Sequence, residues 1–197
     1  MVTAPAHALD AHRAHFEALF RADADPWGYD HAWTEEAKRR AVGAALRGGR
    51  VGRLLELGCG NGASTASLAR CCHHLDAIDG SASAVALTRR RLSARGRCRI
   101  WQASMPEALP PGPYDAIVAT EVLYYLPRGA LAETLGRVRD SLTPHGQLVV
   151  TASVRPFGDR DIGNAELFTA LRRTFGPAVR ERAGGPWRLV VHRSGRP

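Results

Sequence analysis

The stretch LLELGCGNGAST, residues 54–65, joins an apolar run to three glycines, Gly58, Gly60 and Gly62. A strand that leads through a glycine turn into a helix is where an open α/β sheet binds its ligand. Glycine lets the backbone approach a ligand closely and adopt positive φ. The spacing differs from the dinucleotide pattern G-x-G-x-x-G, and no G-K-[ST] follows as in a nucleoside triphosphate loop. The turn therefore predicts a ligand site but does not favour a phosphate.

The whole chain has the composition of an ordinary soluble globular protein. Its 197 residues are 45% hydrophobic and 23% charged, which fits one globular domain over residues 1–197. No apolar run approaches the roughly 20 residues of a membrane span. The first 20 residues carry acids and histidines where a secretory signal needs an apolar centre. We expect a cytoplasmic protein, either a monomer or a homodimer, that does not bind membranes.

The net charge of +8 raises the question of a nucleic-acid partner. Lys38 is the only lysine among the 27 basic residues, a skew that coding bias in a GC-rich genome would produce. The arginines are scattered, and aromatic residues do not alternate with them as in a single-strand binding platform. A small-molecule partner is therefore favoured over nucleic acid, although an RNA substrate stays open as an alternative.

Four cysteines give no disulfide pattern of a small secreted domain. Cys71 and Cys72 precede His73 and His74 directly, which at first suggests a metal site. Adjacent side chains diverge, so four neighbours cannot surround one tetrahedral ion. We expect no metal here, and we interpret the segment as a helix end running into a turn.

Apolar runs bounded by turn residues alternate with segments of helical period. This alternation predicts right-handed crossovers and a mostly parallel sheet with helices on both faces. After the fifth strand comes one more helix, and then two short strands around Gly184 and Gly185 predict an antiparallel hairpin at one sheet edge. We divide the chain into a helical cap or lid (1–47), a ligand-binding core (50–153) and a C-terminal helix with a hairpin (154–197). The expected strands are 53–57, 75–79, 99–103, 114–120 and 147–153 plus two within 178–192, and the expected helices are 63–72, 82–95, 130–142 and 164–175.

Two acids indicate which ligand the glycine turn serves. Glu56 precedes the first glycine, where a carboxylate would repel a pyrophosphate but suit an ammonium group. Asp79 ends the next strand, about 20 residues on, where ribose hydroxyls bind in such sheets. Together they predict a ribonucleoside with a cationic tail and no phosphate, and S-adenosylmethionine has this structure.

Four ordered motifs now resemble the class I S-adenosylmethionine-dependent methyltransferases: LLELGCGNG (54–62), LDAIDGS (75–81), YDAIVATEVLYYL (114–126) and LTPHGQLVV (142–150). DPWGYDHAWTEEAKRR (25–40) and EVLYYLP (121–127) are similar to the nodulation protein S family, N-methyltransferases that act on an amino sugar of a chitin-like oligosaccharide. The resemblance implies a Rossmann-like α/β fold of seven strands with a reversed C-terminal strand.

The resemblance also implies cofactor contacts, with S-adenosylhomocysteine as the product. Glu56 and the three glycines would line the methionine and ribose, while Asp79 with Gly80 and Ser81 would hold the adenosine. Met105 would flank the adenine, and Ser104 stands where many relatives have an aspartate that accepts from the adenine amino group. Thr120 and Glu121 would meet the methionyl end.

The methyl acceptor is less well defined by the sequence. Methyl transfer from a sulfonium is an in-line displacement that positioning can largely catalyse. We expect a small-molecule acceptor, with an amine nitrogen of an amino sugar or natural-product intermediate favoured over oxygen. Tyr124 and Tyr125 follow the fourth strand, where the substrate should enter, although one of the two could instead pack in the core. Tyr124 and Trp33 are candidates for the reacting centre, because aromatic faces stabilise cations. Further candidates are Glu121 at that centre, His31 as a base or simply a surface residue, and Lys38 or Arg39 for the cofactor carboxylate, with Tyr29, His31 and Trp33 in a lid.

Overall fold

The computed structural model describes residues 6–46, 51–93, 96–155, 158 and 160–195. Two helices, α1 (Ala6–Ala22) and α2 (Trp33–Ala45), precede the sheet. The remaining elements alternate along the chain: β1 (Val51–Leu57), α3 (Ala63–Leu68), β2 (Cys72–Asp79), α4 (Ala82–Arg91), β3 (Cys98–Gln102), β4 (Tyr114–Thr120), a 3-10 turn η1 (Leu123–Tyr125), α5 (Arg128–Ser141), β5 (Leu142–Ser153), α6 (Asn164–Phe175), β6 (Arg180–Ala183) and β7 (Trp187–Arg193).

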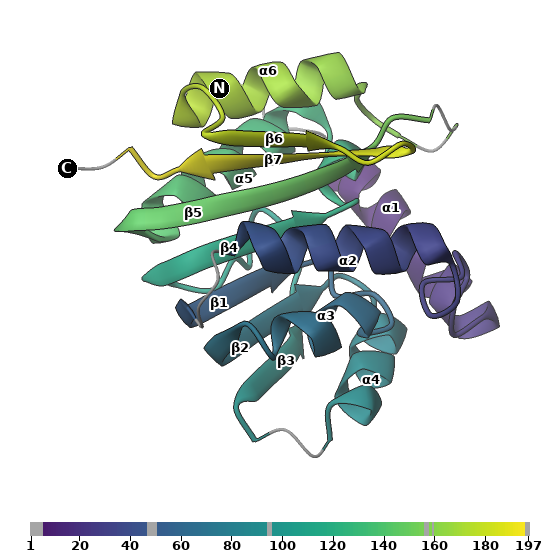
Figure 1. Ribbon diagram of the computed structural model, residues 1–197. Coiled ribbons are helices and arrows are strands. Elements are labelled where there is room, and N and C mark those ends of the chain that lie inside the picture. Colours follow the sequence, from purple (N-terminus) through teal and green to yellow (C-terminus); the bar gives the residue numbers. More distant parts are fainter. Residues whose placement is uncertain (1–5, 47–50, 94–95, 156–157, 159, 196–197) are drawn as a thin grey trace.

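The seven strands form one sheet in the order β3-β2-β1-β4-β5-β7-β6 (Figure 1). The first five strands are parallel, and β7 runs antiparallel to both β5 and β6. The strand order reverses between β1 and β4, which places the ligand crevice of such a sheet at their carboxyl ends. The predicted fold is confirmed: a Rossmann-like, seven-stranded, mostly parallel sheet with a reversed C-terminal strand.

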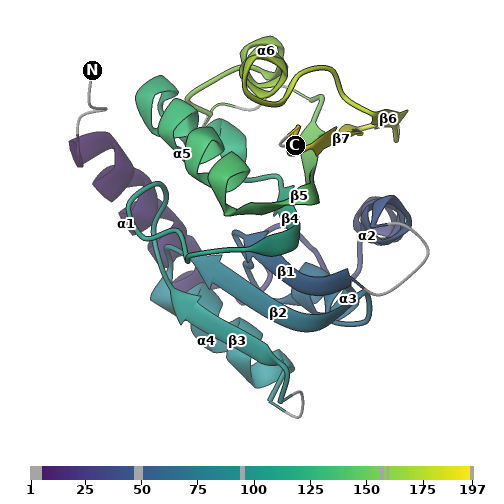
Figure 2. The same ribbon diagram turned by 90° about the vertical axis from the view of Figure 1, so that its left-hand side faces the viewer.

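Helices cover both faces of this sheet, with α2 and α5 on opposite sides (Figure 2). One core layer joins Leu55 and Leu57 of β1 to α5 and α6, and the other joins Leu54 to α2 and α3. Because both faces are covered, β1 carries a continuous run of buried residues from Leu54 to Leu57. Helix α1 lies across the carboxyl ends of the parallel strands, on the right of Figure 1.

Some predicted boundaries were wrong. Helix α3 ends at Leu68 and not at 72, since Cys72 already pairs with Val51 as the first residue of β2. Cys72, His73 and His74 therefore begin a strand, and the prediction of a helix end running into a turn does not hold for them. Strand β5 starts at Leu142, five residues earlier than expected, and makes an irregular pairing with Tyr114.

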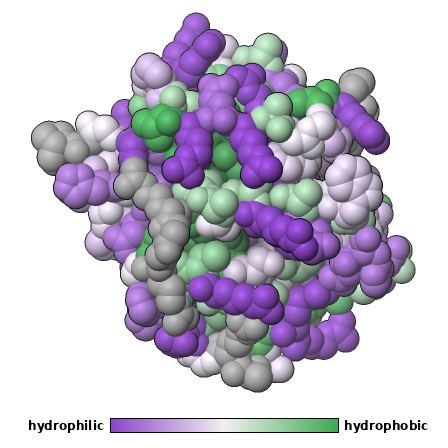
Figure 3. Space-filling model, in the orientation of Figure 1, coloured by the Kyte–Doolittle hydropathy of each residue, from purple (hydrophilic) through white to green (hydrophobic). Residues whose placement is uncertain are grey.

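Hydrophilic side chains cover most of the face that carries α2, with apolar residues between them (Figure 3). Within the part of the chain that the structure describes, no helix is both long and apolar enough to cross a membrane. In the same residues no three His, Cys, Asp or Glu side chains gather as metal ligands would.

Candidate functional site

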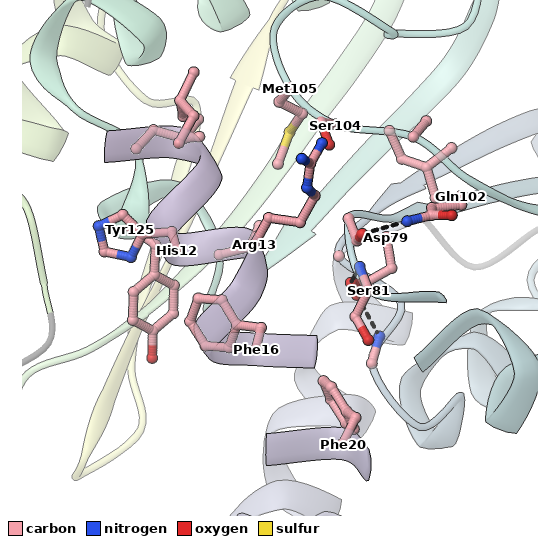
Figure 4. A pocket seen from close by; sticks show the side chains of 18 of the residues that line it. His12, Arg13, Phe16, Phe20, Asp79, Ser81, Gln102, Ser104, Met105 and Tyr125 are labelled. Carbon is pink, nitrogen blue, oxygen red and sulfur yellow. Dashed lines mark hydrogen bonds between the residues drawn. The ribbon is translucent and has the colours of Figure 1, made fainter. Parts of the chain in front are cut away.

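A cavity of about 680 Å³ opens at the carboxyl ends of β1, β2, β3 and β4, beneath α1. Side chains from α1 and from the ends of the strands face one another across it (Figure 4). The structure brings nine of the predicted site residues to its wall: Gly58, Gly60, Asp79, Gly80, Ser81, Ser104, Met105, Thr120 and Glu121.

The glycine turn is held against the end of β2 by main-chain bonds. The N–H groups of Gly58 and Cys59 donate to the carbonyl of Ile78, at 2.9 and 3.0 Å. Gly58 has φ +75°, and a Cβ there would lie 2.8 Å from Cγ2 of Val122. This conformation and this close contact both require glycine.

Asp79 joins the glycine turn to the start of α4. Its Oδ2 accepts from the Gly60 N–H and its Oδ1 accepts from the Ser81 N–H, both at 2.9 Å. Burial nevertheless raises the pKa of the Asp79 carboxyl. A recessed carboxylate of this kind is stabilised by further donors, such as hydroxyl groups of a ligand.

Glu56 lies behind the turn and does not line the cavity. Only 1% of it is exposed, and neither carboxyl oxygen makes a hydrogen bond within the described structure. Burial raises its pKa to about 8, the negative Asp79 adds to the rise, and the nearby Thr65 hydroxyl opposes it. Buried polar groups without partners are rare and call for a physical reason.

The end of β3 supplies a polar and a sulfur-containing contact. Gln102 donates from Nε2 to the carbonyl of Gly80 at 2.9 Å, which fixes the neighbouring strand ends relative to each other. Ser104 and Met105 follow on the cavity wall. No carboxylate occupies position 104, so the hydroxyl is the acceptor that the sequence places there.

Glu121, after β4, is strained and heavily bonded. Its φ is +57°, a left-handed conformation that is uncommon outside glycine and is often found at functional sites. Oε2 accepts from the Tyr124 hydroxyl at 2.7 Å and from the Ser153 N–H at 2.6 Å. Oε1 lies 3.2 Å from Nζ of Lys38. Lys38 is only 5% exposed, and its Nζ also pairs with Glu35 at 2.8 Å.

Three residues predicted for the reacting centre or the lid, Tyr124, His31 and Trp33, do not line the cavity. Tyr124 is 2% exposed, lies outside the cavity wall and packs its ring beneath the Arg160 guanidinium, 4.3 Å from its centre. Its neighbour Tyr125 lines the cavity instead. His31 is exposed and Trp33 is 75% exposed at the start of α2.

The other predicted contacts serve the backbone around the cavity. Arg39 donates to the carbonyl of Tyr29 at 2.6 Å, which supports the segment that lines the cavity. Gly62, at φ +84°, precedes α3 and would bring a Cβ within 3.0 Å of Thr88.

Helix α1 supplies a set of site residues that the sequence reasoning did not identify. Phe16 and Phe20 face the cavity and pack on Trp27, with ring centres 6.1 and 5.4 Å apart. The spacing of Leu9, Phe16 and Phe20 along one helical face was the available signal, but such a stripe normally packs on a core. Also missed were His12, Arg13 and Gln102.

Glu17 fastens this helix to the loop after β2. Its carboxylate accepts from the hydroxyls of Ser81 and Ser83, each at 2.7 Å, and from the Ser83 N–H at 3.1 Å. The Ser83 hydroxyl is the main reason that the Glu17 pKa falls to about 2. Helix α1 is thus fixed to the segment that contains Asp79 and Ser81.

Three comparisons relate this chain to known proteins. Residues 54–146 match the family described as "Methyltransferase domain". Nodulation protein S of Sinorhizobium fredii is 32% identical over 132 residues, 66% of this chain and 61% of that protein, so the chain spans about three fifths of the length of this curated relative.

Solved structures extend the similarity of fold over nearly the whole chain. The N-methyltransferase NodS from Bradyrhizobium japonicum WM9, in complex with S-adenosyl-L-homocysteine, has a TM-score of 0.82 at 24% identity, over 93% of this chain and 98% of that one. The 1,6-didemethyltoxoflavin-N1-methyltransferase of Burkholderia thailandensis has a TM-score of 0.75 at 21% identity, over 98% and 91% of the two chains.

Proposed function

This chain carries a class I S-adenosylmethionine-dependent methyltransferase domain and is homologous to the nodulation S proteins, and from this premise we propose that it transfers a methyl group from S-adenosylmethionine to a small-molecule amine. The observation that carries the proposal is the recessed Asp79 carboxylate, bonded to the glycine turn and facing a cavity large enough for a nucleoside.

The residues around the cavity fit S-adenosylmethionine without a phosphate site. Asp79 would accept from the ribose hydroxyls, and Ser104, Met105 and Gln102 would surround the adenine. The carboxyl of Glu56, buried behind the glycine turn without a hydrogen-bond partner, would become ionised and stabilised where an ammonium group of the ligand paired with it. The bound sulfonium would supply an electrophilic methyl group activated by positive sulfur.

The character of the lining favours an amine as the acceptor. Four carboxylates line the cavity, and its aromatic rings come from Phe16, Phe20, Trp27, Tyr29 and Tyr125. Carboxylates and aromatic faces both stabilise cations, such as the sulfonium and a methylated ammonium. The four carboxylates belong to Asp10, Asp79, Glu107 and Glu121. An oxygen acceptor is the alternative, since the same cavity would also hold a neutral hydroxyl compound.

The protein contributes positioning and exclusion of water to such a reaction. Helix α1 covers the cavity with the aromatic side chains of Phe16 and Phe20. Glu17 fixes this helix to the segment after β2 that contains Ser81 and Ser83. Holding the methyl donor and the acceptor in line lowers the entropic part of the activation barrier, because the two molecules are already oriented when they react. An amine acceptor suited to this mechanism is an amino sugar, as the relationship to nodulation protein S suggests.

Calorimetry tests the donor assignment. We expect S-adenosylmethionine and S-adenosylhomocysteine to bind, and NAD and ATP not to bind. Asp79→Asn should weaken binding by about 1–3 kcal/mol, because hydrogen bonds to a charged acceptor are lost. Asp115→Asn is the matched control, since Asp115 accepts from the Arg53 N–H at the opposite end of β1. Equal affinity in wild type and Asp79→Asn would contradict the assignment.

The acceptor is identified by mass spectrometry of candidates incubated with methyl-labelled donor. We expect label on a glucosamine oligosaccharide or another primary amine. Label on hydroxyl compounds alone would support the oxygen alternative. Strong RNA binding at low salt that falls steeply with added salt would support the RNA alternative.

A further inference from the structure

The wall of the cavity contains His12, which pairs with Asp161, a residue outside that wall, and the reaction outlined above does not yet use either side chain. Resting on the proposed transfer to an amine, we infer that His12 accepts the proton of the acceptor ammonium and that Asp161 is its positioning residue.

His12 lies on α1 where the helix faces the cavity (Figure 4). Its Nε2 is 3.0 Å from Oδ2 of Asp161, and the two side chains are 24% and 30% exposed. The imidazole also lies against Phe16 and Tyr125, with ring centres 6.4 and 6.5 Å away. The ring is therefore restrained on two sides while it remains open to a ligand.

Asp161 is held by the turn that follows β4. Its N–H donates to the carbonyl of Tyr124 at 3.1 Å, and Tyr124 bonds through its hydroxyl to Glu121. The same turn thus places Asp161 next to His12 and Glu121 at the end of β4. A base on the cavity wall, oriented by a carboxylate, is an arrangement suited to proton transfer.

The bond to Asp161 determines which nitrogen can accept a proton. A carboxylate accepts from Nε2–H, so neutral His12 keeps its lone pair on Nδ1. In the described part of the chain His12 makes no other hydrogen bond, which leaves Nδ1 for a ligand. The titratable groups in contact with it are Asp161 and Tyr125 from other elements. The charged neighbours on α1 itself are Asp10 and Arg13, which pair with each other at 2.9 Å.

The proton balance of the transfer is complete with this assignment. The ammonium of the acceptor gives one proton to Nδ1, and the freed lone pair forms the nitrogen–carbon bond to the methyl group. The carbon–sulfur bond breaks and its electron pair passes to sulfur, which becomes neutral. The product is a methylated ammonium, and the imidazolium later loses its proton to water.

Nitrogen-15 spectra of the histidine rings test the geometry without any acceptor. We expect the neutral His12 ring to carry its proton on Nε2, and Asp161→Asn to disturb this preference. A neutral ring protonated on Nδ1 would overturn the inference, because that nitrogen could not accept a proton.

Single-turnover kinetics test the role of His12 in the reaction. The substrate is chosen from glucosamine, a glucosamine tetramer and benzylamine, as the primary amine that wild type methylates fastest. His12→Gln should slow the chemical step at least about 100-fold near neutral pH. The deficit should shrink as pH approaches the pKa of the amine, since the solvent then removes the proton. His15→Gln is the matched control, on the same helix and exposed.

A second variant guards against a folding defect, with thermal unfolding and donor affinity measured in parallel. Asp161→Asn should slow the step about tenfold and leave donor affinity within twofold of wild type. A His12→Gln deficit that is independent of pH, or no larger than that of His15→Gln, would overturn the inference while the proposed function stands. Failure of wild type to methylate any amine would overturn both.

Discussion

The buried carboxyl of Glu56 should lower the stability of the free protein, and Glu56→Gln tests this directly. The pKa of this carboxyl rises from 4.5 to about 8 on folding, because burial disfavours its charged form. Between these values the folded protein holds a proton that the unfolded chain has lost, so stability falls as pH rises from 4.5 to 8. At about 1.4 kcal/mol per pH unit, the loss at pH 7 is on the order of 3 kcal/mol.

Glutamine resembles the protonated carboxyl and does not ionise. We therefore expect Glu56→Gln to be more stable than wild type at pH 7 by up to about 3 kcal/mol, with the difference vanishing near pH 4.5. Urea unfolding without ligand, at several pH values between 4.5 and 8, measures this difference. Glu133→Gln on the exposed side of α5 is the control and should show no such trend.

Ligand binding should respond in the opposite direction. If an ammonium group pairs with ionised Glu56, donor binding releases a proton, and the affinity of wild type rises with pH up to about 8. Glu56→Gln should bind the donor about tenfold more weakly and lose this pH dependence. A stability difference that stays constant from pH 4.5 to 8 would refute the reasoning about the buried carboxyl.

Three further predictions concern the frame of the cavity. Gly62→Ala should lower the free energy of unfolding by about 1–2 kcal/mol, because φ at this position is +84°. Gly136→Ala, in the open middle of α5, is the control and should not lower it. Chemical denaturation measures both variants. Glu17→Gln should destabilise the protein at pH 7, because the ionised Glu17 carboxylate, whose pKa is lowered to about 2, stabilises the fold. The difference from wild type should shrink as pH falls from 4.5 toward 2 and Glu17 becomes protonated. Thermal unfolding curves at several pH values that do not converge would contradict this. Tyr124→Phe should lower the free energy of unfolding by about 1–3 kcal/mol, because the hydrogen bond to Glu121 is lost. In calorimetry it should weaken donor binding less than Asp79→Asn does, because Tyr124 lies outside the cavity wall.

Much of the fold follows from patterns that act over short distances along the chain. The run Leu54–Leu57, the turn at Gly58 and the hairpin near Gly185 are local signals, and each produced the expected element. The ends of elements depend on pairing partners instead. Cys72 becomes a strand residue because Val51 is available beside it, 21 positions earlier in the chain.

The site residues divide along the same line. The strand-end acid Asp79 could be placed at the cavity because sheet topology fixes where strands end. The contribution of α1 could not, because Phe16 meets the cavity only after the chain has folded back over the sheet. The choice between Tyr124 and Tyr125 also escaped prediction, since a single 3-10 turn decides which ring is buried.

The three bonds from Glu17 to Ser81 and Ser83 also couple two motions. Ser81 caps the first turn of α4 by accepting from the Ala84 N–H, and the same hydroxyl donates to Glu17. Lifting α1 to exchange a spent nucleoside for a fresh one would therefore loosen the beginning of α4 at the same moment. We therefore expect variants that weaken these bonds without removing them to release the nucleoside faster.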